Sequence, residues 1–121
     1  MSIISIRGAI TTEYNSKEEI LEASKEMLEA IIEANHLKID EIIQIVFTAT
    51  KDLDAVYPAV AARAIGITSA ALMCAQEMYV EESLNKCIRV AVLVETNELH
   101  KNNIKHQYLR KARVLRADLM E

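Results

Sequence analysis

Two arginines in this sequence stand in apolar surroundings where a charged side chain needs a partner. Arg89 lies inside the run at 86–96, between Ile88 and Val90, and Arg7 lies near the end of a shorter run of the same kind. A buried guanidinium without a partner is very costly, so each arginine must form an ion pair, lie at a sheet edge or face a cavity. A structural ion pair or an edge position explains Arg89 as well as a binding role does.

Three more side chains with useful chemistry lie in or beside apolar runs. Glu77 comes directly after the run at 70–76, which includes Cys74, and Tyr108 lies in the last run of the chain. Taken singly, Glu77 is explained as a solvated turn carboxylate and Tyr108 as a half-buried core aromatic with a solvated hydroxyl. Taken with the arginines, they predict one pocket that holds guanidiniums, a carboxylate, a phenol and a thiol. Guanidiniums bind carboxylates in a bidentate way, so this pocket would suit a small polyanion that bears a hydroxyl.

Other catalytic patterns are missing from the sequence. It contains no G-x-S-x-G, H-E-x-x-H, P-loop or G-x-G-x-x-G motif. His36, His100 and His106 are not at metal-ligand spacing, and each is interpreted as a surface residue. Cys74 has no obvious base beside it, which disfavours nucleophilic catalysis. With Cys87 as the only other cysteine, there is no disulfide framework, and a reduced, cytoplasmic setting is expected.

Length and composition predict a single globular domain over residues 1–121. The chain is 51% hydrophobic and 26% charged, with a formal net charge of −4. This acidic balance argues against nucleic acid as a partner, because binding phosphates needs a basic face. No apolar run reaches the roughly 18 residues of a membrane span, and the N-terminus lacks the apolar centre of a signal peptide.

The elements that must position these residues begin with a strand and a long helix. Residues 2–10 alternate apolar and polar side chains, which predicts a strand. Ser16 and Glu19 form an S-x-x-E capping box, which predicts the start of a helix over about 17–35. The β-branched run at 42–49 predicts a buried strand.

The second half predicts one short helix and three strands. The helix covers about 58–65 and stops at Gly66, and the strands cover 70–76, 86–96 and 107–116. The resulting order, β-α-β-α-β-β-β, predicts an α+β domain whose mixed sheet is covered by helices on one face. Because the central strands are apolar on both sides, the other face should associate with copies of the same chain.

Five segments resemble a known family in order and spacing. They are IRGAITTEYNSKEEI, TATKDLDAVYPAVAAR, CAQEMYV, KCIRV and HQYLRKARVLRADL. Over residues 4–119 the chain resembles the AroH-type chorismate mutases. The resemblance implies a homotrimer with a pseudo-α/β-barrel core and active sites between adjacent subunits. It implies conversion of chorismate to prephenate, the branch step toward phenylalanine and tyrosine, without a metal or cofactor.

The resemblance also indicates site residues. Arg7 of IRGA, Arg89 of CIRV and Glu77 of QEM match the positions expected to be catalytic. The substrate-binding positions match Tyr57, Arg63, Met73, Cys74, Tyr108, Leu115 and Arg116. A Claisen rearrangement needs neither nucleophile nor base, so the missing motifs agree with this chemistry.

Several residues depart from the family pattern. Val60 stands in place of a lysine, Met73 in place of a threonine, Tyr79 in place of an aspartate and Ala117 in place of a proline. The chain ends at Glu121, so the tail expected to close over the site looks short. We expect activity with reduced affinity for substrate.

Two other functions fit the same architecture. One is a RidA-like trimeric imine deaminase, which also uses an arginine in a cleft. The other is an inactive subunit that binds a small anion, which the changes at Val60 and Met73 favour. The C-x-QEM and CIRV motifs favour the mutase.

Overall fold

The computed structural model describes the backbone of residues 2–119 and the side chains through Leu115. Its centre is one five-stranded sheet in the order β3-β2-β4-β1-β5. The strands are β1 (Ser2–Thr11), β2 (Ile42–Ala49), β3 (Ala71–Gln76), β4 (Cys87–Thr96) and β5 (Gln107–Tyr108). The helices are α1 (Lys17–Ala34) and α2 (Ala59–Ala64), with 3-10 helices η1 (Ile39–Glu41) and η2 (Arg110–Leu119). No helix in this part of the chain is long and apolar enough to span a membrane.

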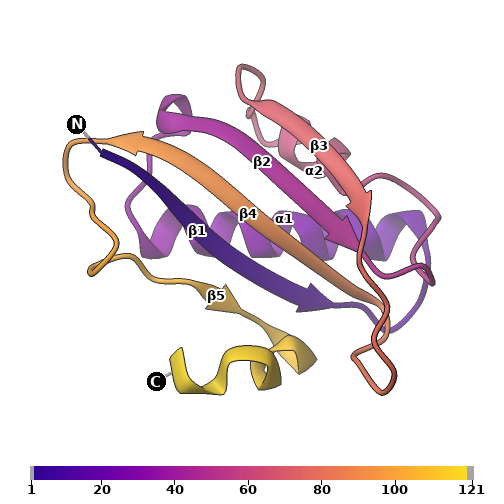
Figure 1. Ribbon diagram of the computed structural model, residues 1–121. Coiled ribbons are helices and arrows are strands. Elements are labelled where there is room, and N and C mark those ends of the chain that lie inside the picture. Colours follow the sequence, from indigo (N-terminus) through magenta and orange to yellow (C-terminus); the bar gives the residue numbers. More distant parts are fainter. Residues whose placement is uncertain (1, 120–121) are drawn as a thin grey trace.

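The sheet is mixed, as the sequence predicts. β4 pairs antiparallel with both β1 and β2, whereas β3 and β5 pair parallel with their neighbours. Helices α1 and α2 lie on the same side of the sheet (Figure 1). The fold is therefore α+β, with the predicted layer of helices on one face.

Alternation along the strands separates a core face from an open face. On β4, Ile88, Val90, Val92 and Val94 are buried. The intervening residues face away from the helices on what we call the open face, which includes Ser5, Arg7, Gln44, Val46, Thr48, Arg89, Ala91 and Leu93. Segment η2 covers one corner of this face, where Tyr108 and Ala112 pack against Ala9 and Cys87.

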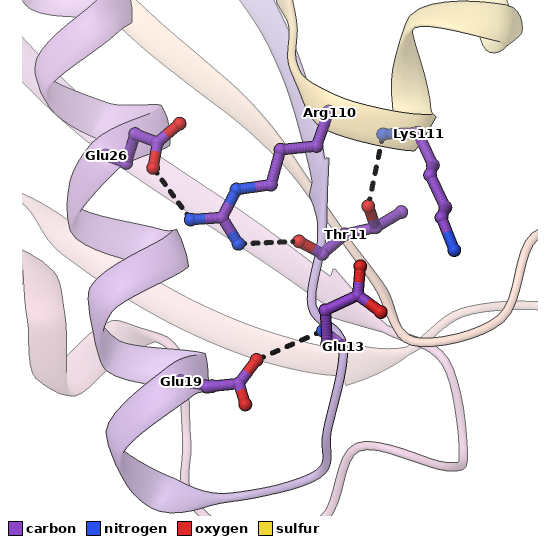
Figure 2. Close-up of polar contacts among 6 residues, drawn as sticks. All are labelled: Thr11, Glu13, Glu19, Glu26, Arg110 and Lys111. Atoms are coloured by element: carbon purple, nitrogen blue, oxygen red, sulfur yellow. Dashed lines mark hydrogen bonds and ion pairs between the residues drawn. The ribbon is translucent and has the colours of Figure 1, made fainter.

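The start of α1 follows the predicted cap with one difference. Ser16 accepts a hydrogen bond from the Glu19 N–H at 3.1 Å, as an N-cap should. The Glu19 carboxylate, however, accepts from the N–H groups of Glu13 and Tyr14 at 3.1 and 3.3 Å. It therefore fixes the loop before the helix (Figure 2).

Close packing of α1 on the sheet depends on Gly8. A Cβ at this position would lie 2.8 Å from Ile31 Cδ1 and 3.1 Å from Val90 Cγ1. The missing side chain therefore lets α1 pack directly against β1, next to Arg7.

The strand predicted at 107–116 is wrong beyond Tyr108. Its last ladder bond is Leu109 N–H to Ala9 O, and Arg110 then adopts φ 55°, which ends the extended conformation. The Arg110 guanidinium donates to Thr11 O at 3.0 Å and pairs with Glu26 at 2.7 Å (Figure 2). The run alternates like a strand, but its apolar positions Tyr108, Ala112 and Leu115 are four and three residues apart, which suits a helical turn.

Candidate active site

Arg89 and Glu77 lie together on the open face, Arg89 near the start of β4 and Glu77 directly after the end of β3. One row of paired residues crosses the sheet through Ala75, Thr48, Arg89, Ala9 and Tyr108. Glu77 follows β3, and its N–H donates to Ala49 O at 2.9 Å. Its Oε1 lies 3.4 Å from Arg89 Nε and accepts a hydrogen bond from Thr48 Oγ1 at 2.5 Å. The structural ion pair considered for Arg89 is therefore present.

This ion pair leaves the guanidinium open to a ligand. The Arg89 and Glu77 side chains are 29% and 23% exposed. Arg89 Nε is buried, yet it forms no hydrogen bond to any described residue and has only the 3.4 Å contact. Nε therefore faces Glu77, and the exposed part of the guanidinium can still bind an anionic or electron-rich oxygen.

Arg7 extends the positive charge to the neighbouring strand. It pairs with Ala91, so it is the diagonal neighbour of Arg89, with the two residues about 7–8 Å apart and their Cβ atoms somewhat closer. Its Nε donates to Val90 O at 3.3 Å, and its N–H donates to His106 Nδ1 at 2.9 Å. The side chain is exposed, so the open face presents two guanidiniums in adjacent rows.

Tyr108 and Leu115 border this part of the face. Tyr108 pairs with Ala9 and is only 3% exposed, in the small cluster that includes Cys87. Leu115 packs against the same cluster. Burial raises the pKa of the Cys87 thiol, while the neighbouring Arg89 guanidinium opposes that rise. Cys87 is therefore a neutral packing residue beside the arginine, on the same face of β4.

A second group of the predicted residues lies around a pocket beside β3. The pocket holds about 600 Å³ and lies between the β2–α2 connection and the end of β3. Its lining residues are Ala49, Thr50, Lys51, Leu53, Asp54, Ala55, Val56, Tyr57, Pro58, Cys74, Ala75 and Gln76. Tyr57 is 71% exposed, and Cys74 is half-buried and unpaired.

Three predicted residues belong to neither group in this chain. Met73 is exposed on the open face, where its row continues through Val46 to Ala91. Arg63 is exposed on α2 and does not line the pocket. The side chain of Arg116 lies outside the described residues.

The single predicted pocket is thus two regions in one chain. We call Arg7, Thr48, Glu77, Arg89 and Tyr108 the arginine group. We call Lys51, Tyr57 and Cys74 the pocket group. Ala75 shares the row of Arg89, so Cys74, the preceding residue of the strand, points to the other side of the sheet.

Further polar side chains, which no sequence motif indicated, hold the arginine group in place. Thr48 donates to Glu77, and Thr50 accepts from the Cys87 N–H at 3.0 Å. Asp52 accepts from Thr50 Oγ1 at 2.5 Å and from the Lys86 N–H at 3.1 Å. Thr50 and Asp52 lie in the turn that follows β2, which the Leu53 N–H closes by donating to Thr50 O at 2.9 Å.

Comparisons with known proteins agree with one another over nearly the whole chain. Residues 3–119 match the family described as chorismate mutase type I. The chain is 47% identical to chorismate mutase AroH of Bacillus subtilis, over 98% of this chain and 94% of the relative. It is 42% identical to chorismate mutase AroH of Thermus thermophilus, over 94% and 93%. A solved chorismate mutase from Clostridium thermocellum superposes with a TM-score of 0.89 at 50% identity, covering 92% of this chain and 98% of the other.

Proposed function

This chain belongs to the type I chorismate mutase family, and from that premise we propose that its arginine group and its pocket group are the two halves of one active site. The protein is an isomerase that converts chorismate to prephenate. Membership of this family supports the mutase activity over the imine deaminase activity that the sequence left open. Both cysteines are unpaired, which is consistent with a reduced, cytoplasmic setting.

The reaction needs little covalent chemistry from the protein. A Claisen rearrangement breaks a C–O bond while a C–C bond forms within one molecule, so it needs no nucleophile and no general base. The enzyme can hold the compact conformer in which the two ends of the substrate meet. It can also place positive charge where the ether oxygen gains electron density.

Arg89 is the residue we assign to the ether oxygen. The observation that carries this assignment is the contact of Glu77 with both Thr48 and Arg89, which fixes the guanidinium on a central strand. A donor held in place before the reaction costs no reorganisation in the transition state. Its partial exposure leaves room for the substrate.

Glu77, Arg7 and Tyr108 would hold the rest of the substrate. Both contacts of Glu77 use Oε1, so Oε2 can accept a hydrogen bond from the ring hydroxyl. Arg7 presents an exposed guanidinium one row away, and Tyr108 borders the same area. We assign these two residues to a substrate carboxylate, with Leu115 packing beside them.

The second half of the site would come from a neighbouring copy in a homotrimer. Arg7 and Met73 are three strand spacings apart, or about 14 Å, and Cys74 points away from the open face. One chain therefore cannot close its pocket group over its own Arg7. Exposed Ile3 and Met73 on the open face also favour a covering subunit. Cys74, Tyr57 and Arg63 of one chain would then meet the arginine group of the next chain, and Arg116 of that next chain would act beside its own Leu115.

Turnover is tested by the loss of chorismate absorbance, with acid conversion of prephenate to phenylpyruvate as a check. We expect turnover that falls by about 10²–10³ in Arg89→Ala. A folded protein without turnover would support the inactive anion-binding subunit instead.

Shared sites are tested by complementation. Arg89→Ala removes one half of the site, and the double variant Tyr57→Ala/Arg63→Ala weakens substrate binding by the other half, so activities are compared as kcat/KM at substrate concentrations well below KM. When the two are co-expressed, random trimers should regain about a quarter of the wild-type sites, because each site needs an intact half from each of two chains. The separately expressed variants serve as controls, and light scattering gives the oligomeric state. Activity no higher than the sum of the separate variants would rule out sites shared between subunits.

A further inference from the structure

The pocket group contains a cation that the family resemblance does not indicate. Lys51 follows β2 directly and lines the pocket near Tyr57. We propose that Lys51 binds a carboxylate of the substrate at the mouth of this pocket. The inference rests on the proposed function, because it takes the pocket to be half of the chorismate site.

The charge of Lys51 is not cancelled by its own chain. No described carboxylate lies within ion-pair distance of its Nζ. Asp54 also lines the pocket, but its Oδ1 is held by Asn15 Nδ2 at 2.7 Å. Asp52, the next residue, accepts from Thr50 and from the Lys86 N–H. Both nearby acids therefore accept hydrogen bonds from other groups, and neither forms an ion pair with Lys51.

An aromatic ring holds the ammonium in place. Lys51 Nζ lies 5.1 Å from the centre of the Tyr79 ring, within the range of a cation–π contact. A neutral ring orients the ammonium without neutralising it, as a carboxylate would. Tyr79 comes two residues after Glu77, in a segment whose position the Glu77 N–H bond to Ala49 helps to fix. The lysine is thus oriented and remains available to an anion.

Lys51 is the one cation among the residues that line this pocket. Val60, on the first turn of α2, places an apolar side chain where the resemblance leads one to expect a lysine. Arg63 lies on the same helix outside the pocket. A substrate with two carboxylates needs positive charge in addition to that of the arginine group. Lys51, on the β2–α2 connection, supplies this charge.

The test is Lys51→Met, measured as KM and kcat across ionic strength. We expect KM to rise about fivefold with kcat nearly unchanged, because a partly exposed ion pair contributes modest, uniform binding. The salt dependence of kcat/KM should also weaken between roughly 0.01 and 0.15 M ionic strength, where the Debye length falls from about 30 to 8 Å. Lys38→Met is the matched control, since Lys38 precedes the opposite end of β2 and should leave both quantities unchanged.

Tyr79→Asp gives an independent readout. The new carboxylate can pair with Lys51, so KM should rise as it does in Lys51→Met, and the double variant should show no further rise. An unchanged KM in Lys51→Met, with the expected loss of turnover in Arg89→Ala, would overturn the role of Lys51 and leave the proposed function intact. A fall in kcat without a change in KM would also overturn it, because that pattern indicates a structural effect. If wild-type protein lacks turnover, the proposed function fails instead.

Discussion

The arginine group and the pocket group differ in what holds them. Arg7, Thr48 and Arg89 lie on hydrogen-bonded strands whose opposite sides are packed against α1 and the core. Tyr57 and Lys51 lie on the connection between β2 and α2, and both are exposed. Strands fix a side chain within a narrow range of positions, whereas a connection can adjust to a ligand. We therefore expect transition-state stabilisation from the arginine group and substrate capture from the pocket group.

The largest effect is expected from a substitution in the arginine group. Arg89→Lys keeps the formal charge but loses the planar guanidinium and its second donor. We expect kcat to fall by on the order of 100-fold, with little change in KM. Steady-state kinetics measure both constants, and a circular dichroism spectrum controls for folding. A near-wild-type kcat would mean that charge alone suffices and that the fixed geometry is irrelevant.

A smaller effect tests whether the strands hold Glu77 in position. Thr48→Val keeps the shape of the side chain and removes the hydroxyl that donates to Glu77. We expect kcat to fall about tenfold, because a hydrogen bond to a charged group contributes roughly 1.5–3 kcal/mol. Thr96→Val is the control, since Thr96 is a buried threonine at the far end of β4. Equal kcat values in the two variants would remove Thr48 from the site.

The third prediction concerns the pocket half of the proposed site. Arg63→Ala removes an exposed cation on α2 that the arginine group does not contact. KM should rise about fivefold while kcat stays within twofold, because the lost interaction attracts the substrate equally in ground and transition states. The reverse pattern, a lower kcat at constant KM, would place Arg63 with the catalytic residues and erase the distinction between the two regions.

Much of the fold could be predicted because the elements have strong local signals. The strand at 42–49 and the helix after Ser16 were located nearly to the residue, since β-branched runs and capping residues act locally. The end of the chain could not be predicted in this way. Its conformation depends on contacts of Arg110 with Thr11 and Glu26, which are distant in sequence.

The candidate site was predictable only in part, for a similar reason. An arginine between two apolar residues is a local anomaly, and it correctly indicated a partner for Arg89. The partner hydroxyl of Thr48 looked ordinary, because its importance comes from the register that sets β2 beside β4. The division into two regions depends on which face each strand residue occupies once all strands are paired. No short motif carries that information.

The smallest effect is expected from a comparison of two cysteines, one in each region. Cys87 is buried beside Arg89 in the cluster with Tyr108 and Ala112, whereas Cys74 is half-buried at the pocket. Burial raises the pKa of the Cys87 thiol, with the Arg89 guanidinium opposing the rise. An unfolded thiol ionises near its ordinary pKa of about 8.5, so above that pH the unfolded state binds fewer protons than the folded state. The free energy of unfolding should then fall as pH rises, by at most about 1.4 kcal/mol per pH unit.

Denaturant unfolding at pH values on either side of about 8.5 measures this slope. In Cys87→Ala the fall should be shallower than in wild type, even though the smaller side chain lowers stability at every pH. Cys74→Ala is the matched control, because it removes the half-buried thiol and leaves Cys87 in place. Identical slopes in all three proteins would mean that burial in the cluster beside Arg89 does not raise the pKa of the Cys87 thiol, and this contrast between the two regions would lose its physical basis.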